Sequence, residues 1–511
     1  MVSLSQLSAQ MNFQIYETDA AVSNDPDIAG ISEDSREVKP GWVFVAVSGL
    51  KYNGLDFVEE ARRKGAAAIL SCRKIEGAKL PQIVVSQDRL RSAMAGAACI
   101  IYNRPSDKLL MAGITGTNGK TTTAYLLEAM LNKAGLAPGV MGTVNFRWPG
   151  AVKDAPNTTP DGTVLACNLA EMHKAGSKAA IMEVSSHALA LGRVSGLGFE
   201  VALFTNLSRD HLDFHTDYED YYQAKKLLFS KYLKPGAKKA AINGDDEYGA
   251  RLAKELGTTA LTFGFGPDNE VRGSELKLNR DGLSFRINWK NISWVQSSPL
   301  LAEVNARNVL GAAALGLTMG LEPRLIEDSL KAAKGAPGRL EKVGQNPDYL
   351  VLVDYAHSPD ALAKALEGCR ELKPARLLTV FGCGGDRDKG KRPIMGEIGG
   401  RMADMAILTS DNPRTENPEA ILADVEAGIK PLGLNKYEEG QLSSTDWKAG
   451  CYLVICDRRK AIKEAVRLME PGDALLIAGK GHEDYQIIGR EKHHLDDREE
   501  ALKSLKDFGR N

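Results

Sequence analysis

The chain contains 511 residues, of which 26% are charged and 43% are hydrophobic, and its formal net charge is −1 at pH 7. A chain of this size is long enough for about two to four domains, each with its own core. The balanced charge gives no basic surface field for nucleic acid, and no apolar run reaches the roughly 18 residues of a membrane span. The N-terminus does not resemble a signal peptide, and the seven cysteines form no CxxC pair. We therefore expect a cytoplasmic protein with free thiols, no bound nucleic acid and no membrane insertion.

The first 107 residues contain short strand-like segments separated by helical patterns. These apolar segments are 42–47, 66–70 and 82–85. Apolar runs of this length that alternate with helical segments are typical of βαβ units. We therefore expect residues 1–107 to form an α/β domain.

A glycine-rich segment, GITGTNGKTTT at 113–123, lies between an apolar run and a helical pattern. Such a turn directs backbone N–H groups and the positive end of the helix dipole at one point, where a phosphate binds. Lys120 can reach the β- and γ-phosphates of ATP, and the Thr121 hydroxyl can bind Mg²⁺. Ile114 stands where the strict P-loop pattern has glycine, so the segment is a variant, and the alternative is an ordinary glycine-rich turn. The predicted ATP-binding residues here are Gly116, Thr117, Asn118, Gly119, Lys120, Thr121 and Thr122.

Three further apolar segments predict more strands of a largely parallel sheet: 179–184, 201–206 and 239–243. Glu183, near the end of the first segment, can hold Mg²⁺, or it can be a surface residue at a turn. His211, after the second segment, is either a metal ligand or one polar loop residue among many. Lys225 and Lys226 lie in an amphipathic helical segment, and their spacing alone predicts solvated lysines.

Glycine and proline interrupt the helical pattern at 334–338, which predicts a linker between domains. The strand pattern then restarts with apolar segments at 350–355, 376–381, 404–410 and 474–479. Polar or glycine-rich residues follow each of them, as at the ligand-binding carboxyl edge of an open α/β sheet. We therefore expect a central domain at 108–336 and a C-terminal domain at 337–511.

Motifs along nearly the whole chain carry a resemblance to one family. In chain order they are EDSREVKPGWVFVAVSG (33–49), GITGTNGKTT (113–122), MEVSSH (182–187), NLSRDHLDFH (206–215), AKKLLF (224–229), GRLE (338–341), VDYAHSPDAL (353–362), GCGGDRDKGKRP (382–393), SDNPRTENPE (410–419) and GKGHEDYQ (479–486). In this order they resemble the Mur ligases of peptidoglycan synthesis. The resemblance implies a three-domain α/β architecture. It would consist of an N-terminal α/β substrate domain, a central P-loop ATPase-type domain with a parallel sheet, and a C-terminal Rossmann-like domain.

The resemblance also implies a reaction in which ATP activates a carboxylate for amide-bond formation. The γ-carboxylate of UDP-N-acetylmuramoyl-L-alanyl-D-glutamate would attack the γ-phosphate of ATP to give an acyl phosphate and ADP. The amine of an incoming amino acid would then displace phosphate. The DNPR motif at 411–414 indicates meso-2,6-diaminopimelate as this amino acid. The expected partners are these three small molecules, bound to a monomer.

Both steps concentrate negative charge, so the resemblance implies a site of cations and oriented N–H groups. The implied catalytic residues are Lys120, Glu183, His211 and Lys225. Thr121 and Glu183 would hold one Mg²⁺ ion, and His211 would help to hold a second. The family carries a carbamylated lysine at the position of Lys225, and a carbamate offers the oxygen ligands that Mg²⁺ prefers.

Other residues match family contacts to ATP and to the UDP-linked dipeptide. The further ATP contacts are Asn305, Arg339, Asp354 and His357. The contacts to the UDP-linked dipeptide are Ser35, Asn157, Thr158, Thr159, Ser185 and Arg193. The chain departs from the family pattern at Leu191, where many relatives have glutamine, and at Asn53, where aspartate is common.

The end of meso-diaminopimelate distal to the reacting amine carries a carboxylate and an ammonium group. Arg414 would pair with this carboxylate through two hydrogen bonds, or it could form an ordinary surface salt bridge. An enzyme that adds lysine would leave a buried arginine here unpaired, at a cost of about 1–3 kcal/mol, which gives a basis for discrimination. The predicted diaminopimelate-binding residues are Arg387, Asp411, Asn412, Pro413, Arg414, Gly479 and Glu483.

Two other classes of protein remain open at this point. A folylpolyglutamate synthetase would share the P-loop and the metal-binding residues, but we would not expect it to contain DNPR or the N-terminal DSR motif at 34–36. A noncatalytic nucleotide-binding protein would have lost phosphate- or metal-binding residues. The residues in question are all present: Lys120, Thr121, Glu183, His211 and Lys225.

Overall fold

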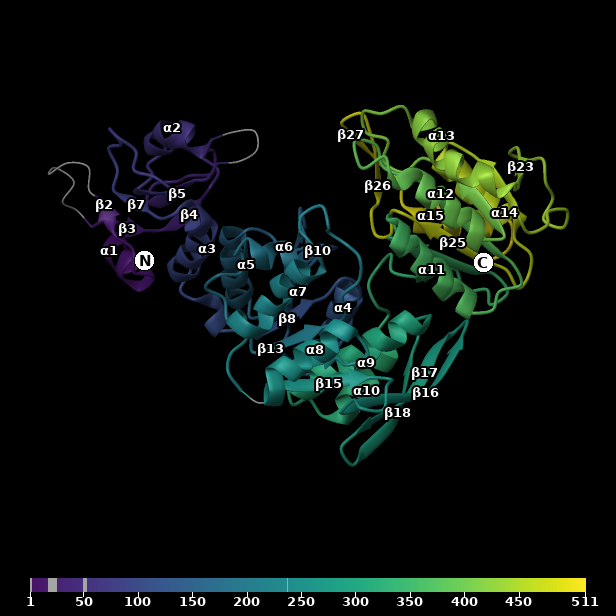
Figure 1. Cartoon of the computed structure of the whole chain (residues 1–511), viewed down its shortest axis with the longest axis horizontal. Coiled ribbons are helices and arrows are strands. Elements are labelled where there is room, and N and C mark those ends of the chain that lie inside the picture. Colours follow the sequence, from purple (N-terminus) through teal and green to yellow (C-terminus); the bar gives the residue numbers. More distant parts are fainter. Residues whose placement is uncertain (1, 17–24, 49–52, 237) are drawn as a thin grey trace. The chain divides into compact units, whose positions relative to one another are not determined.

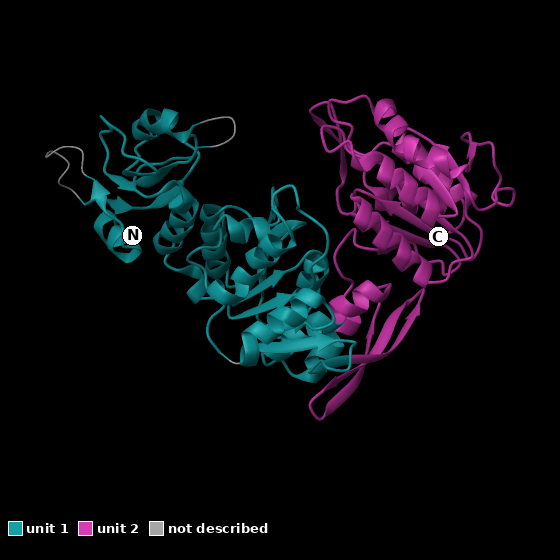
Figure 2. Ribbon diagram, in the orientation of Figure 1, with its two compact units in different colours: residues 1–272, 310–329 teal, residues 273–309, 330–511 magenta. Residues whose placement is uncertain are grey.

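The computed structural model describes residues 2–16, 25–48, 53–236 and 238–511. Gly49, the last residue of the N-terminal motif, lies outside these ranges. The chain divides into two compact units, which Figure 2 distinguishes by colour. The first unit contains residues 1–272 and 310–329, and the second contains residues 273–309 and 330–511. No helix within the described ranges is long and apolar enough to cross a membrane.

The N-terminal part of the first unit is built on a five-stranded sheet with the strand order β2-β7-β6-β5-β4. Its elements are α1 (Leu4–Met11), β2 (Ile15–Tyr16), β4 (Gly30–Ser32), β5 (Trp42–Ala46), α2 (Val58–Arg63), β6 (Ala68–Ser71), β7 (Gln82–Val84) and α3 (Leu90–Ile101), with β1 (Val2–Ser3) paired to β3 (Asp27–Ile28). Only β2 runs antiparallel to its neighbour. Alternate residues of β5 face opposite sides, since Val43 and Val45 pack with α1 and α3 whereas Phe44 and Ala46 pack with α2.

The larger sheet of the first unit has the strand order β11-β10-β9-β12-β8-β13-β14-β15. Its strands are β8 (Leu110–Thr115), β9 (Gly139–Met141), β10 (Asn145–Trp148), β11 (Ala151–Asp154), β12 (Ala179–Glu183), β13 (Val201–Phe204), β14 (Ala240–Asn243) and β15 (Ala260–Gly264). The helices between them are α4 (Lys120–Lys133), α5 (Gly162–Lys174), α6 (Ser186–Ala190), α7 (Tyr218–Leu227) and α8 (Glu247–Leu256). All of these strands run in the same direction except β10, which is antiparallel to both of its neighbours, β9 and β11. The carboxyl ends of β12, β8 and β13 therefore lie side by side.

Helices α3 and α5 pack against each other between the two sheets of the first unit (Figure 1). Buried residues of both sheets and both helices form one core. The contact is close because α5 begins with glycine. A Cβ atom added at Gly162 would lie 2.3 Å from Ala95 Cβ and 2.9 Å from the Arg193 carbonyl oxygen. Only a residue without a side chain lets the two helices approach to this distance.

The boundary between the units crosses three elements: β16 (Val271–Asn279), α9 (Glu303–Thr318) and α10 (Pro323–Ala332). In the second unit, β17 (Gly282–Trp289) and β18 (Ile292–Ser298) form an antiparallel hairpin. The sequence patterns did not predict these strands. Their alternation of buried and exposed residues is typical of a sheet with one solvated face, and it lacks the continuous apolar runs on which the other strands were predicted.

The second unit also contains a seven-stranded sheet with the order β19-β20-β25-β21-β22-β24-β23. Its strands are β19 (Glu341–Val343), β20 (Leu350–Asp354), β21 (Leu377–Phe381), β22 (Met405–Leu408), β23 (Asn435–Tyr437), β24 (Cys451–Val454) and β25 (Ala474–Ala478), followed by the hairpin β26 (Tyr485–Ile488) and β27 (Glu491–His494). Only β19 is antiparallel to its neighbour in the sheet. The helices are α11 (Pro359–Glu371), α12 (Lys391–Met402), α13 (Pro418–Ile429), α14 (Arg458–Leu468) and α15 (Asp497–Asp507).

The helices of this sheet cover both faces, because both faces of its strands are apolar. Leu350 and Leu352 pack in one core with residues of α11, α12 and α13, whereas Val351 and Val353 pack in another with residues of α14 and α15. A parallel sheet with helices on both sides is the Rossmann-like arrangement. The predicted fold, with three mainly parallel α/β sheets, is thus confirmed. The domain boundaries at 107 and 336 stay predictions.

We predict that Gly162→Ala destabilises the first unit by about 1–3 kcal/mol, because the new methyl group has no space between α3 and α5. Urea unfolding followed by circular dichroism measures the change. Gly96→Ala in α3 is the matched control, since its added Cβ would meet only the flexible end of Met11, at 3.1 Å. Equal stability of the two variants would contradict the packing argument.

Candidate active site

The glycine-rich segment forms a loop between β8 and α4, and two glycines permit its shape. Gly116 has a φ of +144°, and a Cβ atom there would lie 1.8 Å from the Thr205 hydroxyl oxygen. Gly119, at the start of α4, has a φ of +86°. The Asn118 backbone N–H donates to the Asn206 side chain at 3.0 Å, which ties the loop to the residues after β13. The loop therefore has the strand–turn–helix form of a phosphate-binding site.

Lys120 and Lys225 converge on the same backbone carbonyl of this loop. Each ammonium nitrogen donates to the Gly116 oxygen at 2.9 Å, and Lys120 also donates to the Thr117 oxygen at 2.8 Å. Lys225, on α7, is almost completely buried and lies over the Tyr221 ring, 4.4 Å from its centroid. Burial, and next to it the charge of Lys120, hold the pKa of Lys225 well below its usual value. Lys225 is therefore not the solvated lysine that its spacing alone predicted.

Glu183 lies at the carboxyl end of β12 and is 2% exposed, so it is not a surface residue. Its carboxylate accepts hydrogen bonds from the Thr121 hydroxyl at 2.8 Å, the Thr143 hydroxyl at 2.9 Å and the Thr143 backbone N–H at 3.0 Å. A Cβ atom at Gly142 would lie 2.1 Å from this carboxylate, so glycine leaves it room. The sequence analysis did not identify Thr143, although it follows β9 at the same sheet edge.

The oxygen atoms of Thr121 and Glu183 are of the kind that Mg²⁺ binds, so this pair fits the expected ion. The pair supplies only part of a coordination shell. Within the described ranges, no three His, Cys, Asp or Glu residues cluster so that they could hold a metal. Phosphate oxygens and water usually complete such shells in nucleotide sites.

His211 lies near the two lysines, in the loop after β13. Its backbone has a left-handed φ of +55°, and its imidazole Nε2 lies 3.5 Å from Asp210. Burial lowers the pKa of His211, and the charges of Lys120 and Lys225 lower it further, against the opposing effect of Asp210. A neutral imidazole is the form that ligates metals.

Residues predicted to hold the UDP-linked dipeptide gather beside Glu183. The Thr159 hydroxyl donates to the Glu183 backbone oxygen at 2.7 Å and accepts from the Ser185 N–H at 3.0 Å. The Arg193 guanidinium donates to the Thr159 backbone oxygen at 2.9 Å. Thr158 shares a hydrogen bond with Thr143 at 3.1 Å, and the neighbouring Asn157 is exposed. Ser35, in contrast, belongs to the N-terminal sheet region, where its hydroxyl donates to Glu60 at 3.0 Å.

Four predicted ATP contacts lie in the second unit. Asp354, at the end of β20, accepts from the backbone N–H groups of Leu340 and Ala356 at 2.8 and 2.9 Å. Burial raises the pKa of Asp354, and Arg339 opposes this shift. The Arg339 guanidinium lies 4.8 Å from the centroid of the Tyr355 ring. The Nδ1 atom of His357 forms a hydrogen bond with the Tyr355 backbone oxygen at 2.9 Å. Asn305, on α9, instead donates to the Leu301 oxygen at 2.9 Å.

A cavity of about 570 Å³ in the second unit contains six of the seven residues predicted to bind diaminopimelate. Its lining consists of Tyr355, His357, Gly384, Arg387, Asp388, Lys391, Asp411, Asn412, Arg414, Gly479, Glu483, Tyr485 and Ile487. Pro413 is buried next to this lining. The cavity lies at the carboxyl edge of the sheet, where the open α/β topology places ligands.

Both cationic and acidic side chains line this cavity. Arg414 has a left-handed φ of +51°, and its guanidinium donates to the Gly385 oxygen at 2.7 Å. Arg387 lies exposed in the preceding glycine-rich loop. Asp411 is buried, and its Oδ1 atom accepts no hydrogen bond. Burial raises the pKa of the Glu483 carboxyl. A ligand that carries a carboxylate and an ammonium group would match this combination of charges.

The sequence analysis missed one buried residue beside this cavity. Lys480 is 0% exposed, and its ammonium lies 3.4 Å from Asp411 and 3.6 Å from Glu483. Lys480 is the second residue after the apolar strand β25, and its charge at this place in the GKGHEDYQ motif was the signal available for it.

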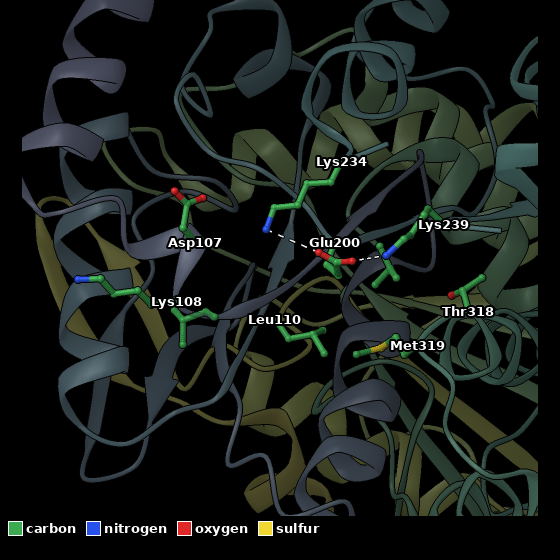
Figure 3. Close-up of a pocket in the computed structure, with 10 residues that line it drawn as sticks. Asp107, Lys108, Leu110, Glu200, Lys234, Lys239, Thr318 and Met319 are labelled. Carbon is green, nitrogen blue, oxygen red and sulfur yellow. Dashed lines mark hydrogen bonds and ion pairs between the residues drawn. The ribbon is translucent and has the colours of Figure 1, made fainter. Parts of the chain in front are cut away.

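A second cavity, of about 500 Å³, lies at the opposite edge of the larger sheet in the first unit (Figure 3). Leu110 begins β8 and Val201 begins β13, so these lining residues lie at the amino ends of their strands, away from the P-loop. Glu200 forms ion pairs with Lys239 and Lys234 within the wall. Its charged groups thus largely compensate one another.

Comparisons with known proteins identify the family of this chain. Three family models match the chain: a Mur ligase family catalytic domain at 27–109, a Mur ligase middle domain at 114–316 and a Mur ligase glutamate ligase domain at 338–481. UDP-N-acetylmuramoyl-L-alanyl-D-glutamate–2,6-diaminopimelate ligase of Geobacter metallireducens is 43% identical, over 94% of this chain and 95% of its own. The ligase of the same name from Synechocystis sp. is 42% identical, over 99% and 98%. A solved structure of a ligase of this name covers 100% of both chains at 32% identity, with a TM-score of 0.70. The chain belongs to the Mur ligase family.

Proposed function

We propose that this chain joins meso-2,6-diaminopimelate to UDP-N-acetylmuramoyl-L-alanyl-D-glutamate, with ATP as the energy source, in peptidoglycan precursor synthesis in the cytoplasm. The observation that carries the proposal is the cavity of the second unit, which offers arginines to a carboxylate and acidic groups to an ammonium. The relatives named for this ligase, which match 94% or more of the chain, support it.

In the first step, the γ-carboxylate of the dipeptide attacks the γ-phosphate of ATP, and ADP leaves. The loop N–H groups and the positive end of α4 bind the phosphates, and Lys120 turns from the loop carbonyls toward them. Thr158, Thr159, Ser185 and Arg193 hold the dipeptide beside this loop. In the second step, the diaminopimelate amine attacks the acyl carbon, and phosphate leaves.

Mg²⁺, held by Thr121 and Glu183 with a second ion near His211, would neutralise charge on the phosphates when bound. Carbamylation of Lys225 would supply a further anionic group. Burial disfavours the protonated form of Lys225, and once the amine has lost its proton, its free electron pair can attack CO₂. A second proton then leaves, and the resulting carbamate is an anion next to Lys120. The modification thus replaces repulsion between two cations by attraction.

We predict that Lys225→Ala loses most of the ligase activity, and that short carboxylic acids such as formate or acetate restore part of it, because they replace the carbamate oxygens. Phosphate release under saturating substrates measures both effects. The matched control is Lys226→Ala, since Lys226 forms an ion pair with Glu255 at 2.8 Å and does not contact the loop. Wild-type turnover by Lys225→Ala in CO₂-free buffer would contradict the prediction.

We predict that wild-type protein uses meso-diaminopimelate far better than L-lysine, and that Arg414→Ala lowers kcat/KM for meso-diaminopimelate by roughly 10²-fold, as expected for loss of a charge-assisted bidentate pair. The KM values for ATP and for the UDP-linked dipeptide should barely change. L-lysine should remain a poor substrate, because the variant loses an attraction without gaining a new one.

Arg490→Ala provides the control for loss of an arginine, since Arg490 is exposed in the turn between β26 and β27. If Arg414→Ala retains the discrimination between the two amino acids, Arg414 does not determine the specificity, and Arg387 becomes the leading candidate. If the wild-type protein turns over neither amino acid, the proposed function itself is wrong.

A further inference from the structure

Lys480 is buried behind the acidic side of the cavity in the second unit and does not line it. Its ammonium donates to the Asn412 side-chain oxygen at 3.1 Å and to the Tyr485 backbone oxygen at 2.5 Å. The carboxylates of Asp411 and Glu483 lie 3.4 and 3.6 Å away. One buried cation thus faces two carboxylates of the cavity wall.

The hydrogen bonds around Asn412 fix the direction of its amide group. The side-chain oxygen accepts from Lys480 and, at 2.9 Å, from the Ile487 backbone N–H. The amide nitrogen therefore points the other way and donates to Glu483 at 3.1 Å. Through Asn412, Lys480 determines which side of the Glu483 carboxylate remains available to a ligand.

The net charge of this part of the cavity is complementary to one ammonium group. Asp411 and Glu483 contribute two negative charges when ionised, and Lys480 compensates one of them. The buried Oδ1 atom of Asp411 faces the Lys480 ammonium at 3.4 Å but accepts no hydrogen bond. A ligand N–H that donates to this oxygen would therefore be favoured.

We propose that Lys480 is a positioning residue for the distal ammonium group of the incoming amino acid. It orients Asn412 and Glu483 and leaves one net negative charge on the acidic wall, which is formed by Asp411 and Glu483. It does not touch the ligand itself. This inference rests on the proposed function, because it assumes an amino-acid substrate with an ammonium group at its distal end.

The test compares two ligands that differ only in this group. meso-Diaminopimelate has the distal ammonium, whereas L-2-aminopimelate has the reacting amine and the distal carboxylate but no distal ammonium. In Lys480→Met, the KM for meso-diaminopimelate should rise at least tenfold, with a smaller change in kcat. The inhibition constant of L-2-aminopimelate as a competitor should change less than about threefold, since this ligand never used the acidic wall.

Lys492→Met is the matched control and should leave both constants unchanged. Lys480 and the exposed Lys492 both lie over the Tyr485 ring, 5.7 and 4.1 Å from its centroid. If Lys480→Met does not fold, Lys480→Gln carries the same comparison, since it retains an N–H donor and removes the charge. If Lys480→Met weakens the binding of both ligands equally, or of neither, the inference is overturned. Wild-type turnover of meso-diaminopimelate, measured alongside, shows whether the proposed function itself holds.

Discussion

The convergence of two lysines on the Gly116 carbonyl is the constraint on which the chemistry of the first unit depends. Two ammonium groups that share one acceptor repel each other, and burial strengthens this repulsion because it removes water. Lys225 is the more deeply buried of the two, and this burial disfavours its charged form. Lys120, at the more accessible position, is the proposed phosphate ligand. The same fold therefore provides a cation for ATP and a reactive amine a few ångströms away.

The cavity of the second unit is lined by groups of opposite charge, and the proposed recognition of diaminopimelate depends on them. The arginines come from loops that follow β21 and β22, and the acidic groups come from the residues after β22 and β25. Left-handed backbone at Arg414 and the positive φ of +120° at Gly479 bring these loops together. Since Asp411 is buried and Arg414 and Glu483 are partly buried, a ligand that lacks one of the matching charges leaves such a group unpaired. This cost, rather than the fit of the methylene chain, is what distinguishes similar amino acids.

The sequence predicted those features that depend on local patterns. The P-loop, the carboxylate at the end of β12 and the arginine of DNPR each follow an apolar strand, and parallel topology brings such residues to one edge. Thr143 and Lys480 also follow strands, but their contacts join segments distant in sequence, so their position after a strand did not by itself distinguish them from other polar residues. Lys225 and Lys226 are neighbours of the same type. The packing of α7 against the loop determines that Lys225 is the buried one. The local pattern did not distinguish the two lysines, whereas the family motif pointed to Lys225. Strands β16 to β18 were missed because a half-solvated sheet has alternating rather than continuous apolar residues.

The proposed mechanism requires that the γ-phosphate of ATP is transferred to the dipeptide carboxylate before the amide bond forms. Isotope labelling can detect this step. The γ-carboxylate of the UDP-linked dipeptide can be labelled with ¹⁸O and the released phosphate analysed by mass spectrometry after turnover with ATP and meso-diaminopimelate. An acyl phosphate predicts one ¹⁸O atom in each phosphate, with the other carboxylate oxygen retained in the amide. Unlabelled phosphate, or label in AMP instead, would contradict the account.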